Sequence, residues 1–269
     1  MQQKILRKLY EIEKTENVSI LLAIESGSRA WGFASTDSDY DVRFIYVRPQ
    51  EEYLRLDPVR DVIELPLDPV FDINGWDLQK ALRLMYKSNP TSFEWLASPI
   101  VYMETDFADK LRNRRNDYFS VKHSLYHYLS MATGNYREFL QKDMVKAKKY
   151  FYVLRPILAC RWILEKQTPP PMLFSELAKA ELPDKMKAEV EELLSLKMNA
   201  PEIRKIPRID RINKYLEQSM AEIKEEAQKL KETKVATWDI LNEMFLEEVS
   251  YVESKDYILA KLLEKLWGG

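Results

Sequence analysis

Two aspartates that stand two residues apart open an apolar segment of this 269-residue chain. Asp39 and Asp41 lie at the start of a stretch, residues 42–47, whose β-branched and aromatic side chains predict a strand. Side chains at i and i+2 of a strand point the same way, so the two carboxylates converge. Close carboxylates repel unless a cation or a proton neutralises them, and Mg²⁺ prefers a few carboxylates together with substrate phosphates. Taken alone, the pair favours a plain acidic turn before a strand, and a divalent-metal site is the alternative that the preceding turn supports.

A glycine–serine turn stands ahead of the aspartates in the sequence. Gly27 and Ser28 follow residues 18–24, an apolar run that predicts a buried strand. The chain has 6 glycines, where an average composition would give roughly 19, so a glycine here calls for a specific reason. Gly27 lets the backbone pass close to a ligand, Ser28 offers a hydroxyl, and a short helix from Ser28 would present its amides to an anion. We therefore expect this turn to hold a phosphate while the next strand holds a metal.

Two other ligand-binding motifs fail in the same segment. Gly27 and Gly32 have the spacing of a P-loop, but Phe33 follows where that motif needs lysine. The alternating aspartates of residues 37–41 imitate the start of an EF-hand, but its twelfth position is Arg48 instead of a bidentate glutamate. Both motifs are rejected because the residues that carry their chemistry are missing.

The composition excludes several classes of protein. Hydrophobic residues make up 46% and aromatic residues 12%, which is enough for a sizeable core and argues against disorder. The longest apolar run, residues 20–24, is far too short to cross a bilayer, and the N-terminus lacks a signal-peptide pattern. The single cysteine, Cys160, excludes an intramolecular disulfide. We expect a cytoplasmic protein without a membrane partner.

Charge is distributed unevenly along the chain. Residues 1–75 carry 9 basic and 14 acidic side chains, whereas residues 76–166 carry 16 basic and 9 acidic ones. An acidic first third beside a basic middle third suits a metal site that faces a polyanion. Solvated helix faces rich in lysine and arginine would produce the same numbers.

The elements that must position these residues change character along the sequence. The first part alternates between helical and strand-like patterns. Helices are expected over residues 5–12, from Leu78 with Asp77 as its cap, and from Pro90 with Asn89 as its cap. Strands are expected at residues 18–24, 41–47, 62–65, 70–73 and 100–103.

From about residue 107 onward the pattern is helical. The expected helices are residues 107–118, 120–141, 144–166, 174–181, 184–197, 207–232 and 236–266. The class is therefore α+β, with a strand-containing domain at residues 1–118 followed by an all-helical domain at residues 119–269.

The order Gly-Ser, a stretch of ten residues and then Asp-x-Asp resembles the DNA polymerase β-like nucleotidyltransferase superfamily. Further blocks look like the RlaP (YcgL-like) family of predicted nucleotidyltransferases, which was named for a proposed place in RNA repair. The blocks that carry this resemblance are residues 28–32, 39–46, 75–80, 87–90, 94–96 and 149–156.

The resemblance implies a small mixed sheet with helices as the catalytic domain and a third carboxylate on a neighbouring strand. Asp72, between apolar residues of the strand expected at 70–73, matches the family's pattern. Asp77 is the competitor, and it is better explained as a helix cap. Asp39, Asp41 and Asp72 would then bind Mg²⁺, or Mn²⁺ in its place, and carry the catalysis.

By the same resemblance, the nucleotide would be held by residues from both halves. Gly27 and Ser28 would hold the departing pyrophosphate, with Arg29 as a charge partner. The helical half would supply further contacts to the triphosphate from one helix face, where Lys149, Tyr152 and Arg155 are spaced at i, i+3 and i+6. A solvated helix face is the alternative for the lysines.

The function that follows is transfer of a nucleoside monophosphate from an NTP to a hydroxyl acceptor, with an RNA end favoured by the family context. One alternative keeps the chemistry but changes the acceptor to a protein or a small molecule. The other is a non-catalytic nucleotide-binding or antitoxin-like partner protein.

Overall fold

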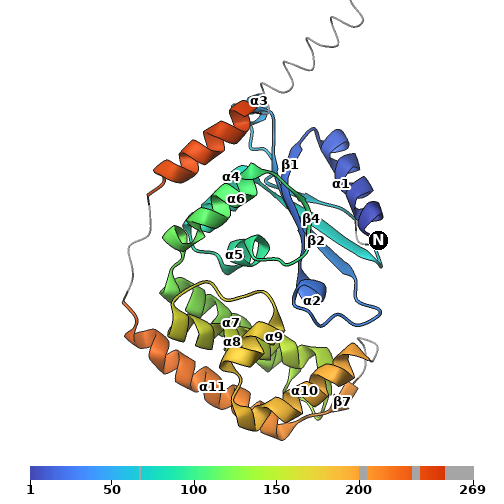
Figure 1. The fold of residues 1–269 in the computed structure, drawn as a ribbon, viewed down its shortest axis with the longest axis vertical. Helices are drawn as coiled ribbons and strands as arrows, with labels where there is room; N and C mark the ends of the chain where they lie inside the picture. Colours follow the sequence, from blue (N-terminus) through green and yellow to red (C-terminus); the bar gives the residue numbers. More distant parts are fainter. Residues whose placement is uncertain (67, 200–204, 232–236, 252–269) are drawn as a thin grey trace, which may run out of the picture.

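A five-stranded mixed sheet forms the centre of the N-terminal half (Figure 1). The computed structural model describes residues 1–66, 68–199, 205–231 and 237–251. The strand order is β3-β4-β2-β1-β5; β2 and β4 run parallel, and the other neighbouring pairs run antiparallel. The strands are β1 (Ser19–Glu25), β2 (Tyr40–Val47), β3 (Val62–Glu64), β4 (Phe71–Asp77) and β5 (Val101–Glu104).

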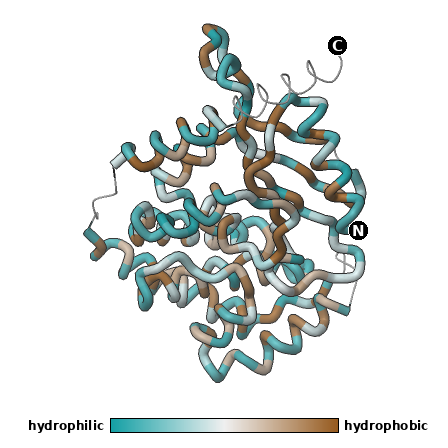
Figure 2. Tube along the Cα trace, turned by 45° about the horizontal axis from the view of Figure 1, so that its top comes forward, coloured by the Kyte–Doolittle hydropathy of each residue, from teal (hydrophilic) through white to brown (hydrophobic). Residues whose placement is uncertain are grey.

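Helices pack on both faces of this sheet. The helix α1 (Gln2–Glu16) buries Ile5, Leu9 and Ile12 against one face. The opposite face packs against α4 (Leu78–Tyr86), α5 (Pro90–Leu96) and α6 (Asp106–Arg114). Apolar residues follow the strands between these layers (Figure 2). Short helices α2 (Gly27–Ala30), α3 (Gln50–Tyr53) and η1 (Arg115–Tyr118) complete this half.

The predicted helix caps are confirmed. The Asp77 carboxylate accepts a hydrogen bond from the Gln79 amide at the start of α4. Asn89 accepts one from the Thr91 amide, with Pro90 in the first turn of α5. Both side chains satisfy amides that a helix start leaves without partners.

The second half is a bundle of helices, so the α+β class is confirmed. Its helices are α7 (Val121–Phe139), α8 (Ala147–Lys166), α9 (Phe174–Glu181), α10 (Asp184–Met198) and α11 (Asp210–Lys229). None of the helices within the described ranges combines the length and the apolar character needed to cross a bilayer.

This half is not purely helical, which corrects one expectation. β6 (Met144–Lys146) pairs with β7 (Lys205–Pro207), so the helix expected from residue 144 begins at Ala147. Val145 is buried between two exposed neighbours, and this two-residue period is that of a strand.

Phe33 and the last described helix are among the contacts that join the halves. Phe33, on the loop after α2, enters the helical core and contacts the rings of Phe151 and Phe174 at centroid distances of 5.0 and 5.6 Å. The last described helix, residues 239–251, returns to the N-terminal half, where Leu241 and its neighbours join the core beside α4 to α6. The domain boundary predicted at residue 118 assigned this last helix to the helical domain, whereas its buried side chains pack in the core of the N-terminal half. Residues 237 and 238 of the helix expected at residues 236–266 are not helical, and residues 236 and 252–266 lie outside the described residues.

Candidate functional site

Asp41 and Asp72 lie side by side because β2 and β4 are parallel and in register. Their backbones pair directly in this ladder. Partners in a parallel ladder project side chains to the same face, so both carboxylates stand on the face of the sheet away from α1. The structure therefore brings together the two aspartates that the sequence assigned to neighbouring strands.

Arg43 stands between the two carboxylates. Its Nη2 donates to Asp41 Oδ1 at 3.1 Å and to Asp72 Oδ2 at 2.7 Å, and its Nη1 donates to the Asp72 carbonyl at 2.7 Å. One guanidinium thus holds one oxygen of each carboxylate and fixes their spacing. Arg43 lies two residues beyond Asp41, so the strand period that paired the aspartates could also have found it.

Burial makes Asp41 a weaker acid than an ordinary aspartate. Desolvation raises its pKa to about 6; Arg43 opposes the shift, whereas Asp39 and Asp72 add to it. The site holds more negative charge than one guanidinium neutralises, which is the condition under which a divalent cation binds favourably.

Gly27 packs directly against Asp41. It adopts a left-handed φ of +58°, and a Cβ added to it would come within 1.9 Å of Asp41 Oδ2. The neighbouring Ser26 amide donates to the Asp41 carbonyl at 2.8 Å. The glycine–serine turn therefore packs directly on the Asp41 carboxylate, and only glycine fits there.

Ser28 belongs to a small hydroxyl network. Its Oγ donates to Ser38 Oγ at 3.2 Å, and the Ser35 amide donates to the same Ser38 oxygen at 3.0 Å. These bonds hold the loop between α2 and β2 beside the carboxylates.

Glu25 supports the site, and the sequence reading missed it. This residue is fully buried at the end of β1. Its Oε1 accepts a hydrogen bond from the Asp41 amide at 2.9 Å, and its Oε2 accepts one from the Tyr102 hydroxyl. Burial raises its pKa. The available signal was a carboxylate closing an otherwise apolar run just before the Gly-Ser turn.

Asp39 is not part of β2, although its negative charge contributes to the raised pKa of Asp41. It is exposed and lies in the loop just ahead of β2. Within the described residues, no three acidic, histidine or cysteine side chains already form a metal-binding cluster. Asp41 and Asp72 fit a hard cation by their oxygen donors and shared face, and Asp39 would join them from the strand entry.

Comparison with known proteins shows the family of this chain. The family model described as "RlaP: RNA repair pathway DNA polymerase beta family" matches residues 1–247. The protein YcgL of Bacillus subtilis (strain 168) is 47% identical over 254 residues, covering 94% of this chain and 98% of its own. The chain belongs to the RlaP family.

A solved structure offers a looser likeness. It is described as the crystal structure of a nucleotidyltransferase-like protein from Exiguobacterium sibiricum 255-15, and it is 15% identical with a TM-score of 0.32. The match covers 97% of this chain and 91% of that one. A likeness at this TM-score does not show that the two proteins share a function.

In this RlaP-family chain, the helical half meets the Gly-Ser turn through Trp31, which ends α2. Tyr152 of α8 contacts the Trp31 ring edge-on at a centroid distance of 5.9 Å. Lys149 places its Nζ 3.6 Å from the centre of the Phe139 ring and 4.5 Å from that of Tyr152. Of the predicted residues, Tyr152 is thus brought to Trp31 beside the turn, whereas the two ring contacts of Lys149 lie within the helical half.

Arg155 has a different place from the one that the sequence suggested. Its side chain is 2% exposed, and its Nη1 donates to Glu94 Oε1 at 2.8 Å. The same Glu94 oxygen accepts from the Tyr128 hydroxyl at 2.7 Å, and the guanidinium lies over Trp31 at 4.8 Å. The assignment of Arg155 to the nucleotide is corrected, because a buried guanidinium held by Glu94 has no surface for a phosphate.

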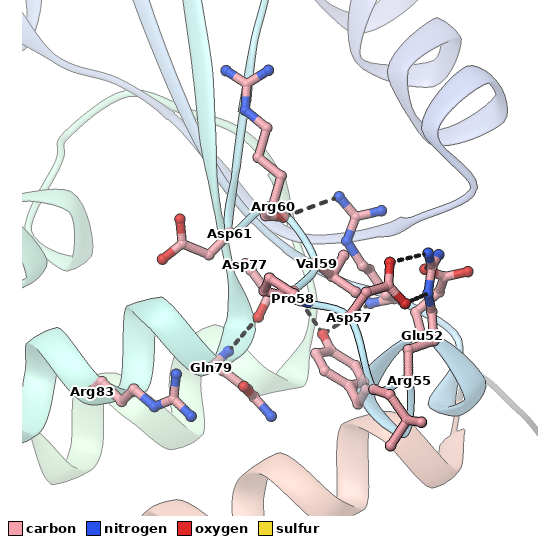
Figure 3. A pocket seen from close by; sticks show the side chains of 13 residues that line it. Glu52, Arg55, Asp57, Pro58, Val59, Arg60, Asp61, Asp77, Gln79 and Arg83 are labelled. Carbon is pink, nitrogen blue, oxygen red and sulfur yellow. Dashed lines mark hydrogen bonds and ion pairs between the residues drawn. The ribbon is translucent and has the colours of Figure 1, made fainter.

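Asp77 is excluded from the carboxylate site by its position at the other end of β4. It lines a separate hollow of about 360 Å³ beside α3 and α4 (Figure 3). Its carboxylate accepts from the Tyr53 hydroxyl at 2.8 Å as well as from the Gln79 amide. Five residues of strand, at ~3.3 Å each, separate it from Asp72. The structure thus favours Asp72 as the neighbour of Asp41.

Proposed function

We propose that this RlaP-family protein is a nucleotidyltransferase that moves a nucleoside monophosphate from an NTP to a hydroxyl acceptor. The single observation that carries the proposal is the alignment of Asp41 with Asp72, with Gly27 packed on Asp41. An enzyme of this class needs carboxylates for a divalent cation next to a turn that accepts phosphates. Asp41, Asp72 and the Gly-Ser turn, which lie together where β1 ends and where β2 and β4 begin, support the proposal.

Asp41, Asp72 and Asp39 would hold Mg²⁺ or Mn²⁺, which supplies positive charge to the entering and leaving oxygens of an in-line displacement. Arg43 keeps one oxygen of Asp41 and one of Asp72 engaged, so each carboxylate retains another for the metal. Glu25 holds the backbone that carries Asp41. These contacts pre-organise the ligands, which outer partners of a metal site commonly do.

The transfer breaks the bond between the α-phosphorus and its bridging oxygen and forms a bond to the acceptor oxygen. Pyrophosphate leaves toward Ser28 and the Gly27 amide, and the acceptor proton passes to a carboxylate, for which Asp72 is our candidate. Tyr152 reaches Trp31 from α8, and Tyr152 and the neighbouring Lys149 would contact the triphosphate. Family membership favours an RNA end as the acceptor.

The test uses NTPs labelled at the α-phosphate, with Mg²⁺ or Mn²⁺, and RNA, protein and small-molecule acceptors in separate reactions. We expect label on RNA 3′ ends, and none with Asp41→Asn. Label on protein or on a small molecule would keep the chemistry and change the acceptor. If label never leaves the NTP pool while the protein binds nucleotide stoichiometrically, and Asp41→Asn binds equally well, the non-catalytic alternative is correct.

A further inference from the structure

A hollow beside the Gly-Ser turn is not used by the proposed chemistry. It has a volume of about 570 Å³ and lies between the start of α1, the loop after α2, the start of β5 and the end of α10. The start of α1 and α2 can be followed on one side of the molecule in Figure 1. Ile5, Ile100 and Met198 give it apolar walls, and its size is that of a small-molecule site, about 300–1,000 Å³.

Arg29 and Tyr40 line this hollow, and the guanidinium of Arg29 lies over the ring of Tyr40. The Arg29 guanidinium lies 3.8 Å from the centre of the Tyr40 ring. Its Nε donates to the Asp39 carbonyl at 2.9 Å and its Nη2 to the Ser38 carbonyl at 2.6 Å. Two backbone carbonyls and one aromatic ring therefore hold the guanidinium in place.

This geometry changes the role of Arg29. Two of its nitrogens are committed to backbone carbonyls, so it is poorly placed to clamp a triphosphate with a fork of donors. What remains is a fixed cationic plane stacked on an aromatic ring, within apolar walls. Flat surfaces of this kind bind nucleobases, which stack on aromatic rings and on arginine planes.

We propose that the hollow binds a nucleobase against the Arg29–Tyr40 pair. The inference rests on the proposed function for its choice of ligand. Arg29 directly follows Ser28, and Tyr40 lies between Asp39 and Asp41, so the base would sit next to the residues that take the phosphates. Tyr40 and Asp41 point to opposite faces of β2, so the bound strand or nucleotide would pass over the start of that strand.

The base can come from two sources. It is either the base of the NTP itself or an unpaired base at the end of an acceptor RNA. Both present the same planar chemistry to Arg29 and Tyr40, and competition separates them.

The first experiment measures nucleoside binding by saturation-transfer NMR, using adenosine and uridine without metal and ribose 5-phosphate as a probe that lacks a base. We expect saturation of the base protons and no comparable binding of ribose 5-phosphate. Arg29→Lys keeps the charge but loses the plane, and Tyr40→Leu loses the ring. Each should weaken nucleoside binding by about fivefold or more, because a stacked base contributes on this scale.

Arg83→Lys is the matched control, because Arg83 is an exposed arginine that lines the other hollow. It should bind nucleosides like the wild type, and unchanged far-UV circular dichroism would show that all variants are folded. The proposal is overturned if no nucleoside binds, if Arg29→Lys and Tyr40→Leu bind as the wild type does, or if ribose 5-phosphate competes equally.

Competition then identifies the source of the base. Displacement of adenosine by a non-hydrolysable ATP analogue with Mg²⁺ supports the base of the NTP, and displacement by a short single-stranded RNA alone supports the acceptor. Asp41→Asn should leave adenosine binding intact. Arg29-dependent binding without any transfer would refute the proposed function only, and transfer without such binding would refute this inference only.

Discussion

At the scale of single residues, Asp41 is where burial, strand register and charge act together. Its carboxylate is desolvated, faces Asp72 and touches Gly27, and its pKa is raised to about 6. A carboxyl group whose folded pKa lies above its unfolded value destabilises the fold when it ionises. The contribution of Asp41 to stability is therefore most favourable below pH 4 and is lost as the pH rises through 6.

The first prediction is that Asp41→Asn does not destabilise the metal-free protein. At pH 7.5 in EDTA, the free energy of unfolding should be unchanged or higher by up to about 3 kcal/mol, at 1.36 kcal/mol per pKa unit. The lost bond to Arg43 reduces this gain. At pH 5 the wild-type carboxyl is mostly protonated, so the difference should shrink. Urea unfolding at both pH values measures it.

Asp57→Asn is the control for this pH dependence. Asp57 is exposed, and its hydrogen bonds with Arg55 lower its pKa. Its stabilising contribution is present above its unfolded pKa and is lost on acidification, which is the opposite sign. A loss of more than about 1 kcal/mol in Asp41→Asn at pH 7.5 would contradict our account of the site.

The second prediction concerns the backbone at Gly27. Gly27→Ala should lower the free energy of unfolding by at least about 1–2 kcal/mol and weaken Mn²⁺ binding, because the new Cβ meets Asp41 Oδ2 and φ is positive. Gly134→Ala is the matched control: it lies within α7, and no atom stands within 4 Å of the added Cβ. That control should gain about 0.5–1 kcal/mol. Equal behaviour of the two variants, measured by thermal unfolding and by electron paramagnetic resonance of Mn²⁺, would refute the packing argument.

At the scale of elements, α8 is bound to α5 by a buried charge. Arg155 pairs with Glu94, whose side chain is 14% exposed, and Tyr128 of α7 donates to the same oxygen. Leaving one member of a buried pair without its partner is costly, whereas replacing both members can be nearly neutral. The pair holds the helical half in a fixed orientation to the Gly-Ser turn.

The third prediction is a strong coupling between these two residues. Arg155→Met and Glu94→Gln should each lower the free energy of unfolding by about 3–5 kcal/mol, and the double variant should lose less than their sum. Denaturant unfolding of the four proteins gives the coupling energy. Additive losses, together with a selective fall in nucleotide affinity for Arg155→Met, would return Arg155 to the nucleotide.

At the scale of the whole molecule, residues late in the sequence pack against the N-terminal half. The helix at residues 239–251 leaves the helical half and packs on the N-terminal half, where the Tyr118 hydroxyl donates to the Thr237 carbonyl at 3.1 Å. The ring of Phe245 meets that of Tyr53 edge-on at a centroid distance of 5.1 Å. Stability of the N-terminal half therefore depends on residues late in the sequence.

The fourth prediction tests this dependence. Leu241→Ala and Met244→Ala should each cost about 2–5 kcal/mol, because both side chains are buried in the core beside α4 to α6. Leu246→Ala, on the same helix but 62% exposed, should change stability by no more than about 0.5 kcal/mol. Hydrogen exchange should show faster opening of α4 and α6 in the first two variants alone. Uniform effects of all three would mean that the helix does not support this half.

The sequence by itself determined most of the elements, apart from the β6–β7 pair, and two of the three predicted aspartates of the site. Apolar period and capping residues predicted the strands and the helix starts at Asp77 and Asn89, because these signals are local. The Gly-Ser turn and Asp39 with Asp41 were found because their spacing lies within a single stretch of chain. Asp72 came from resemblance, since no local pattern shows which strands become neighbours.

Only the tertiary structure decided which distant groups meet. The parallel register put Asp72 beside Asp41, and Arg43 and Glu25 acquired their roles because each bonds to a partner on another strand. Arg155 looked like a surface cation, since lysine and tyrosine share its helix face, but Glu94 from the other half buries it. The charge and the spacing of residues can be read from the sequence, whereas burial and pairing depend on contacts between residues that are far apart in it.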